Sequence, residues 1–425
     1  MVLLTACLIG GCVKPFEPRQ DLDEFIFSWG FLKIFYIFQE ELTFDPLSFP
    51  SVESLYNVVK DPYTFYIPPE QFNDEEEGEQ GRLSIGLGVF LGQSGEKYYI
   101  RHLIDPSPAK TAGLIENDTL ISADGKTLIG VDSYTLFQSL KGKLNSQLLL
   151  TIKRSNLILD FVITRGYFTA PSVFLDTLDN INQIYHLSLL QFTDSTTHPQ
   201  GSWFELVQAI QKVENAKMTI LDLRGNPGGL LDQCLLICEE FLKSGQIIAQ
   251  ARIRILDSLS SESGITLNKT YQAQLSNDIA EQRDFILLVD RYSASAAELL
   301  TIALKANRPD IHIMGERTYG KARAQLVAST PSGGQIRVTS QTLLSSTGFD
   351  YNEIGIEPNE NLSPDSSSYW LNQAYLHALQ ELGIPKTKIS AQNIRRFRNK
   401  LNLIDINRRL LLPSTKNPLP FFKIQ

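Results

Sequence analysis

Apolar runs of strand length alternate with longer apolar runs of helical type in the second half of the chain. Residues 218–223 and 285–289 are continuous apolar runs typical of buried strands. Residues 229–242 and 295–304, which follow them, show the longer pattern of helices. This alternation predicts a layered α/β core in residues 168–363.

Two different patterns precede this core. Residues 20–80 combine apolar helical patterns with proline-bounded turns and end in the acidic run 74–79, which we interpret as a domain boundary. Residues 83–167 instead contain short β-type runs, such as 97–104 and 147–153, separated by glycine and aspartate turns. The sequence therefore predicts an N-terminal helical segment followed by a small β-rich module.

The last part of the chain, residues 364–425, contains one amphipathic helical pattern and a basic stretch, which we interpret as a solvated helix face rather than a lipid-binding site. Near the other end, residues 25–38 are aromatic and apolar. Lys33 interrupts this run, which is shorter than the roughly 20 residues that a bilayer requires. We therefore expect a buried helix there.

Length and charge limit the classes of function. The chain has 425 residues, too many for one ordinary core, so several compact units are expected. It carries 39 Lys and Arg against 47 Asp and Glu, a formal net charge of -8. Because no domain has a basic excess that would neutralise phosphates, nucleic acid is not an expected partner.

The four cysteines form two pairs with different interpretations. Cys7 and Cys12 follow small and apolar residues at the N-terminus, which resembles a bacterial lipoprotein signal. Residues 1–19 are thus expected to be a signal and tether, with Cys12 ahead of Cys7 as the lipidated residue. A frayed apolar terminus is the alternative. Cys234 and Cys238 lie four residues apart in a leucine-rich segment, which favours core packing over zinc binding.

The first candidate for chemistry is Ser295. The apolar run 285–289 leads into a turn of small residues, and Glu298 begins a helical pattern directly after it. A hydroxyl at such a turn protrudes, and the NH groups of the first helical turn are available to a developing oxyanion. An ordinary helix N-cap would have the same serine-rich composition.

The second candidate is Lys321. The five histidines show no flanking motif that marks a catalytic base. A lysine can be the base if burial lowers its pKa from about 10.4 toward 7 to 8. Lys321 follows a glycine after a strand-like run, and Gln325 lies four residues further on, where it would orient the amine. An ordinary surface lysine is the alternative.

The third candidate is a glycine-rich bend. The apolar run that ends in Leu221-Asp222-Leu223 is followed by Arg224-Gly225-Asn226-Pro227-Gly228-Gly229 and a helical pattern. The backbone amides of Gly228 and Gly229 would be free to face a substrate carbonyl. A plain turn between strand and helix would also use glycine and proline, but this segment is richer than a turn requires.

Together these three segments resemble the C-terminal processing, or tail-specific, peptidases, which are serine proteases with a Ser-Lys dyad. The resemblance extends from about Asp61 to Asn361 and includes Gly355-Ile356-Glu357-Pro358. The chain departs from the family at Ala322, where glycine is usual. By position, the resemblance implies Ser295 as nucleophile, Lys321 as general base, Gln325 as its positioning residue, Gly229 and Ala296 as oxyanion-hole donors, and Gly228, Glu298 and Thr318 as supporting residues.

The β-rich module resembles a PDZ domain, on the segments Ser84 to Val89 and Ser107 to Ile121. In that fold a glycine loop presents NH groups to a terminal carboxylate, and the next strand pairs with the peptide. The residues expected to bind peptide are Ile85, Gly86, Leu87 and Gly88. A tight β-turn is the alternative for the Gly-Leu-Gly segment.

These observations predict a serine endopeptidase that holds apolar C-termini of unfolded proteins on its PDZ domain and cleaves by acyl transfer. The dyad requires no metal and no organic cofactor. The resemblance and the lipoprotein signal imply an exported, lipid-anchored protein of the cell envelope that faces the periplasm or the cell exterior. A non-catalytic PDZ-bearing lipoprotein that binds peptide C-termini is the main alternative. A hydrolase that uses one of the histidines is another.

Overall fold

The structure is a computed structural model, and it describes residues 22–69, 84–94, 96–131, 133–194, 196–257, 264–274, 279–363 and 370–385. Cys7, Cys12, the acidic run 74–79 and the basic stretch after residue 385 lie outside the described residues. Within that part of the chain, no helix has both the length and the apolar composition needed to cross a membrane.

A six-stranded sheet lies at the centre of the core and has the order β10-β11-β12-β15-β16-β19. Its strands are parallel except for β10 at one edge. The strands are β10 (Val173–Asp179), β11 (Ile184–Leu189), β12 (Met218–Asp222), β15 (Phe285–Val289), β16 (His312–Gly315) and β19 (Glu360–Asn361).

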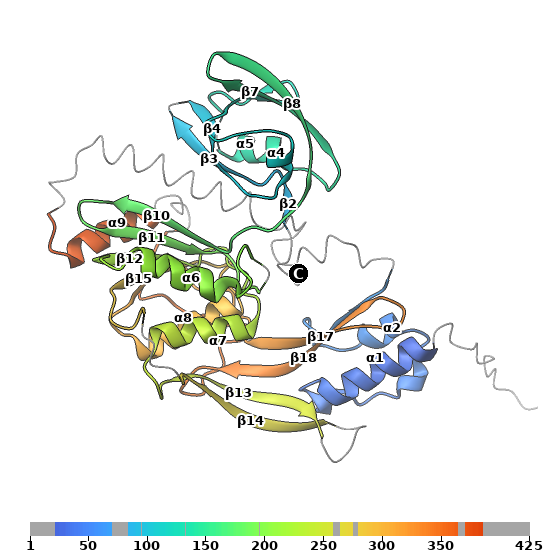
Figure 1. Cartoon of the computed structure of the whole chain (residues 1–425). Helices are drawn as coiled ribbons and strands as arrows, with labels where there is room; N and C mark the ends of the chain where they lie inside the picture. Colours follow the sequence, from blue (N-terminus) through green and yellow to red (C-terminus); the bar gives the residue numbers. More distant parts are fainter. Residues whose placement is uncertain are drawn as a thin grey trace, which may run out of the picture.

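Helices cover both faces of this sheet (Figure 1). On one face, Leu187, Leu221 and Leu287 pack in a cluster with apolar residues of three helices. On the other face, Ile220 and Ile286 pack against the C-terminal helix. The helices are α6 (Gly201–Lys212), α7 (Leu231–Phe241), α8 (Ala296–Asn307) and α9 (Trp370–Glu381). The predicted mixed α/β fold of the core is therefore confirmed.

A second sheet continues the core and receives the N-terminal segment. Its order is β1-β18-β13-β14, and β17 also pairs with β18. Phe65 of β1 pairs with Arg337 of β18, so a strand from the first 70 residues completes a sheet of the core. The strands are β1 (Phe65–Ile67), β13 (Ile247–Leu256), β14 (Gly264–Gln272), β17 (Arg323–Ser329) and β18 (Gln335–Leu344).

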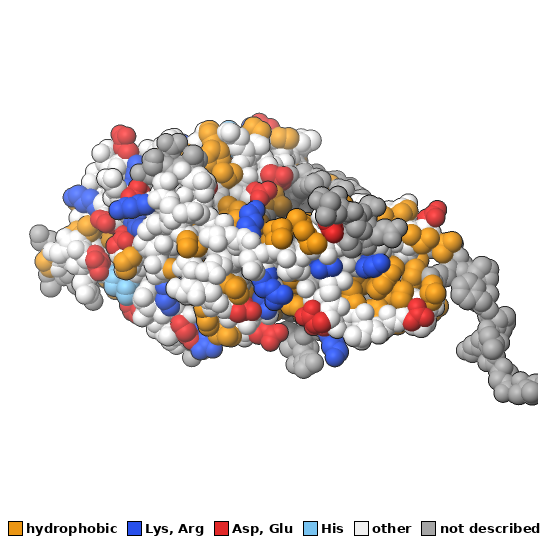
Figure 2. All heavy atoms as spheres, turned by 90° about the horizontal axis from the view of Figure 1, so that it is seen from below, with side chains coloured by type: hydrophobic (Ala, Val, Ile, Leu, Met, Phe, Trp, Pro, Cys, Tyr) orange, Lys and Arg blue, Asp and Glu red, His pale blue; other side chains and the backbone are white. Residues whose placement is uncertain are grey.

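The N-terminal helices α1 (Leu22–Phe35) and α2 (Val52–Tyr56) lie against this second sheet, with the short 3-10 turns η1 (Gln39–Glu41) and η2 (Pro46–Ser48) between them. The expectation of a buried helix is only half right. Phe25 and Leu32 are buried, but Ile26 and Phe27 are 59% and 37% exposed. Figure 2 shows apolar side chains gathered at this end of the molecule. Because α1 packs on one face only, its all-round apolar composition leaves a row of apolar side chains in solvent.

The β-rich module forms a separate body above the core in Figure 1. Its sheet has the order β3-β4-β5-β7-β8, with β6 beside β5, while β2 pairs with β9. The elements are β2 (Ser84–Gly86), β3 (Val89–Ser94), β4 (Lys97–Leu103), α4 (Pro108–Thr111), β5 (Thr119–Ala123), β6 (Lys126–Thr127), α5 (Ser133–Leu140), β7 (Gln147–Arg154), β8 (Leu157–Thr164) and β9 (Gly166–Phe168).

The module has its own apolar core and a small contact with the α/β core. The rings of Phe90 in β3 and Phe174 in β10 lie 4.9 Å apart. Arg101 and Asp176 form an ion pair of 3.2 Å beside them. The first module strand after the glycine loop therefore contacts the edge of the central sheet.

Candidate active site

Ser295 lies at the turn between β15 and α8, as the sequence predicted, and its backbone is strained. Its φ is 56° and its ψ is -116°, a conformation that residues other than glycine rarely adopt. Such a sharp turn holds the side chain at the start of a helix, where the NH groups of the first turn are unpaired. Strain of this kind is commonly retained at functional sites because surrounding contacts compensate for it.

Glu298, on the first turn of α8, supplies those contacts. Its carboxylate is fully buried and accepts hydrogen bonds from the NH of Ser295 at 2.9 Å, the hydroxyl of Thr318 at 2.6 Å, the NH of Gly320 at 2.6 Å and the NH of Lys321 at 2.7 Å. Burial raises the pKa of Glu298 above its ordinary value, and these four donors oppose that rise. Glu298 thus fastens the turn of Ser295 to the loop that carries Lys321.

The glycine-rich bend lies directly against the serine turn. A methyl group at Gly228 would lie 2.7 Å from the Cβ of Ser295 and 2.8 Å from the backbone N of Ala296. A methyl group at Gly229 would lie 2.0 Å from the carbonyl oxygen of Phe192. Both positions also have positive φ, so both require glycine.

The backbone amides at this contact are not equivalent. The NH of Gly228 donates to the side-chain oxygen of Asn226 at 2.8 Å, so it is already used. Among the described residues, the NH groups of Gly229 and Ala296 have no acceptor. These are the two amides that the resemblance assigns to the oxyanion hole, and both are available to a substrate oxygen.

Lys321 lies on the loop before β17, and its side chain is partly buried. Its Nζ donates to the side-chain oxygen of Gln325 at 3.0 Å, as the spacing of four residues predicted. The Nζ also lies 5.1 Å from the ring centroid of Tyr63, a residue of the N-terminal segment. Gln325 is held in turn by a bond of its amide to the carbonyl of Arg323 at 3.1 Å.

Burial lowers the pKa of Lys321 from 10.5 to about 8. The nearby charge of Arg337 lowers it further, whereas Asp61 and Glu298 act in the opposite direction. Near neutral pH a useful fraction of such an amine is uncharged and can accept a proton. Tyr63, Asp61 and Arg337 are residues of the site that the sequence did not single out.

The structure brings the backbones of Ser295 and Lys321 together, but it does not join their side chains. Both backbone NH groups donate to the same Oε2 of Glu298. No hydrogen bond joins the hydroxyl of Ser295 to the Nζ of Lys321, and that Nζ donates to Gln325 instead. In free enzymes, catalytic hydrogen bonds are often long and shorten only when substrate is bound.

The structure accommodates the methyl group of Ala322, at the position where the family usually has glycine. Its methyl group is fully buried in a small cluster with Tyr351 and Ile356. Its NH donates to the side chain of Asn352 at 3.1 Å. The methyl group therefore packs away from the site, and the NH of the preceding Lys321 keeps its bond to Glu298.

None of the five histidines, all of which lie in the described residues, hydrogen-bonds Ser295. His186 is buried and contacts Asp222 and Ser188 instead. His102 pairs with Glu116, and His198 stacks on Phe204. His312 and His377 lie together at another edge of the central sheet. The geometry thus offers Ser295 no histidine as a base.

The residues expected to bind peptide lie at the start of the module. Ile85 and Gly86 end β2 and pair with β9, while the side chain of Leu87 is buried in the module core. Gly88 has a φ of 72°, and a methyl group there would lie 2.4 Å from the Cβ of Ser107. Strand β3 begins at the next residue and lies at the end of its sheet, so its outer edge has no strand partner among the described residues.

Comparisons with known proteins bear on the region that holds these residues. A sequence model described as "Peptidase family S41" matches residues 184–362. The carboxy-terminal-processing protease of Bartonella bacilliformis is 27% identical over 301 residues, which cover 70% of this chain and 66% of that protein. A Staphylococcus haemolyticus protein named "Probable CtpA-like serine protease" is 26% identical over 363 residues, covering 84% of this chain and 67% of that one.

The match thus spans about two thirds of the length of these relatives. Among solved structures, a Bacteroides fragilis protein whose title assigns it to the S41 proteases superposes with a TM-score of 0.54 at 16% identity. The superposition covers 85% of this chain and 98% of that one, and it bears on the fold alone. The matched region contains Gly228, Gly229, Ser295, Lys321 and Gln325. These comparisons agree: residues 184–362 match the S41 peptidase family, and the chain is similar over most of its length to serine-type carboxy-terminal-processing peptidases.

Proposed function

We propose that this chain is an endopeptidase in which Ser295 attacks the scissile carbonyl and the uncharged amine of Lys321 takes the hydroxyl proton. The attack forms a bond from the serine oxygen to the carbonyl carbon, and the resulting oxyanion accepts from the NH groups of Gly229 and Ala296. Lys321 then gives the proton to the leaving amine as the scissile C–N bond breaks, which leaves an acyl-enzyme ester on Ser295. Water later hydrolyses the acyl-enzyme and regenerates the serine.

The observation that carries this proposal is the carboxylate of Glu298, which accepts from the NH groups of both Ser295 and Lys321. Since one carboxylate oxygen accepts from both backbones, the two residues are held on adjoining loops, and the proposal requires the lysine amine to reach the hydroxyl when substrate is bound. Gln325 holds the amine in the free enzyme and would hold one of its protons during transfer.

A non-catalytic protein that binds peptide C-termini is the second candidate, because the β-rich module alone would suffice for such binding. The lowered pKa of Lys321 and the strained turn of Ser295 favour catalysis instead. Neither feature benefits a protein that only binds peptides, and both carry a cost in folding free energy.

The β-rich module supports recognition of a C-terminal tail. We propose that it is a PDZ domain in which the loop from Ile85 to Gly88 receives the terminal carboxylate and the open edge of β3 pairs with the peptide. Phe90 of this strand contacts Phe174 of the peptidase core, so the proposed binding strand lies at the junction of the two units.

Tail recognition predicts that cleavage depends on a free carboxylate. An unfolded substrate with an apolar C-terminus should be cleaved at least about tenfold more efficiently than the same substrate with a C-terminal amide, because the amide removes a charge-assisted interaction. The ratio of kcat/KM values for the two substrates measures this. As a control, a polar final residue should reduce cleavage of both forms. Equal values for acid and amide would reject tail recognition and leave the Ser-Lys mechanism intact.

We also propose that Cys12, or failing that Cys7, is lipidated and attaches the protein to a membrane of the cell envelope, facing the periplasm or cell exterior. The small and apolar residues before each cysteine support this. In cells grown with a labelled fatty acid, Cys12→Ser should abolish the label and move the protein to the soluble fraction. If Cys7→Ser loses the label and Cys12→Ser keeps it, Cys7 is the lipidated residue. If the variant with both substitutions keeps the label, neither cysteine is lipidated and the proposal is rejected.

A further inference from the structure

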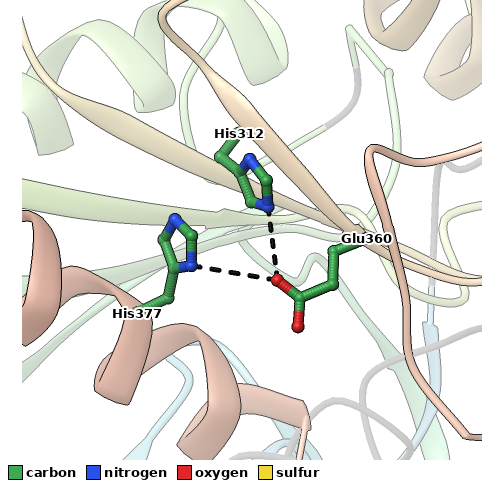
Figure 3. Close-up of side chains that lie close together, drawn as sticks. All are labelled: His312, Glu360 and His377. Atoms are coloured by element: carbon green, nitrogen blue, oxygen red, sulfur yellow. Dashed lines mark hydrogen bonds and ion pairs between the residues drawn. The ribbon is translucent and has the colours of Figure 1, made fainter.

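Three side chains with metal-binding atoms converge at the edge of the central sheet, away from Ser295. His312 is the first residue of β16, Glu360 is the first residue of β19, and His377 lies on α9. Figure 3 shows both imidazole rings directed at one carboxylate oxygen. The Nε2 of His312 lies 3.3 Å and the Nδ1 of His377 lies 3.8 Å from the Oε2 of Glu360.

The composition of this cluster matches a transition-metal site. Two histidines and one glutamate form a ligand set used by zinc, with a fourth position left for water. One ligand atom from each of the three residues lies within 4.8 Å of the other two. Sequence reasoning missed the set because its members come from three segments, 312, 360 and 377, with no local spacing motif.

A fourth residue, Glu381, lies near the ring nitrogen of His377 that faces away from Glu360. Glu381, one turn further along α9, has its Oε1 3.3 Å from the Nε2 of His377. Histidines that bind metals commonly donate their other ring NH to a carboxylate, which fixes the tautomer and ring orientation. Among the described residues the Nε2 of His377 has no hydrogen-bond partner, and Glu381 is the carboxylate near enough to accept its NH when Nδ1 binds an ion.

The packing of the two rings also suits neutral ligands. The two rings are stacked with centroids 4.3 Å apart and planes 12° apart, an arrangement that two charged rings would disfavour. Neutral imidazole is the form that binds metals.

Ordinary ion pairing does not account for this arrangement well, because one carboxylate oxygen is directed at two stacked rings. Coordination requires the rings to tilt so that their in-plane lone pairs meet at one point. The side chains of His312 and Glu360 are 33% and 45% exposed, so they have room for that adjustment.

We propose that His312, Glu360 and His377 bind one zinc ion, which fastens helix α9 to the central sheet. Strand β16 ends at Gly315, shortly before the loop with Thr318 and Lys321, and β19 pairs with β16. The ion would therefore secure the C-terminal helix to the strand that precedes the general-base loop. The Ser-Lys chemistry does not pass through this ion, whose fourth position would be left to water.

The test is a zinc titration of the full chain after treatment with a chelator, in competition with a chromophoric chelator. One equivalent should bind, and His312→Ala and His377→Ala should each weaken binding at least about tenfold, with a smaller loss for Glu381→Gln. His102→Ala is the matched control, since His102 also pairs with a glutamate, Glu116, at 2.8 Å, but no third metal-binding side chain joins them in the described part of the chain. It should bind zinc as the unaltered chain does.

Melting curves separate loss of the site from loss of the fold. Zinc in large excess over its Kd should raise the melting midpoint of the unaltered chain and of His102→Ala, but not that of His312→Ala. If His377→Ala fails to fold, His312→Asn, at a partly exposed position, provides the same comparison. Absence of stoichiometric binding would overturn the proposal, as would equal affinity in the His312 and His102 variants.

Discussion

Replacing Ser295 with alanine is expected to lower kcat/KM by about 10⁴-fold or more, to the level left by the oxyanion donors and substrate binding alone. The loss follows because the hydroxyl of Ser293, in the same turn, is buried and already donates to the carbonyl of Leu223, so it does not replace that of Ser295. Mass spectrometry of the products from a mixture of unfolded proteins measures it directly, with the native and Ser295→Ala enzymes compared at equal concentration.

The control for this change is Ser329→Ala, the same chemical change at an exposed position of β17. It should leave product formation unchanged. The Ser295→Ala protein should also still bind C-terminal peptides, because the β-rich module is remote from the change in sequence and has its own core. Undiminished cleavage by Ser295→Ala would contradict the mechanism, and binding without turnover in the native protein would favour the non-catalytic alternative.

Replacing Lys321 with alanine is expected to lower kcat about 10³-fold or more, because the hydroxyl of Ser295 then lacks a base. In the native enzyme the active form has the neutral amine, and its pKa is about 8. Activity should therefore rise about tenfold per pH unit below that value and level off above it. Initial rates between pH 6 and 10 at subsaturating substrate measure this profile, with Lys243→Ala, an exposed lysine, as control.

The charges of Arg337 and Asp61 provide a second test of whether the pH profile of activity reports the titration of Lys321. Arg337 lowers the pKa of Lys321, so Arg337→Gln should raise that pKa and move the rising limb to higher pH. Asp61 raises the pKa, so Asp61→Asn should move the limb to lower pH. Opposite shifts assign the titration to Lys321. A limb that stays near the ordinary pKa of histidine in both variants would point to an imidazole base.

The local parts of the site could be predicted from the sequence because each motif combines a strand, a bend and a helix start in one short segment. The position of Ser295 before α8, and the contact of Lys321 with Gln325, follow from such local patterns. Glycine at 228 and 229 was also informative, since both positions have positive φ and lie against other backbone atoms.

Contacts between distant segments were not predictable in the same way. Glu298 reads as a favourable residue in a first helical turn, yet its carboxylate accepts from Thr318, Gly320 and Lys321. Nothing in the sequence near Tyr63 shows that it lies against Lys321 through the pairing of β1 with β18. Such contacts depend on tertiary packing, which a single sequence does not encode in a local period.

For helix α1 the sequence predicted more burial than the structure has. Its apolar residues surround the helix, and this composition predicted burial. Only one face packs against the second sheet, so Leu22, Ile26 and Phe27 remain exposed. Composition gives the amount of apolar surface on a helix, whereas the neighbouring elements decide how much of it is covered.

The reaction of the protein with a serine-directed fluorophosphonate tests the central claim most directly, because it reports on the nucleophile and its base without any assumption about substrate. Peptide mapping should locate one adduct at Ser295, formed at a rate that rises with pH up to about 8 and is lost in Lys321→Ala. An adduct at another residue, or a rate of labelling that is the same in Lys321→Ala, would contradict the proposed pair.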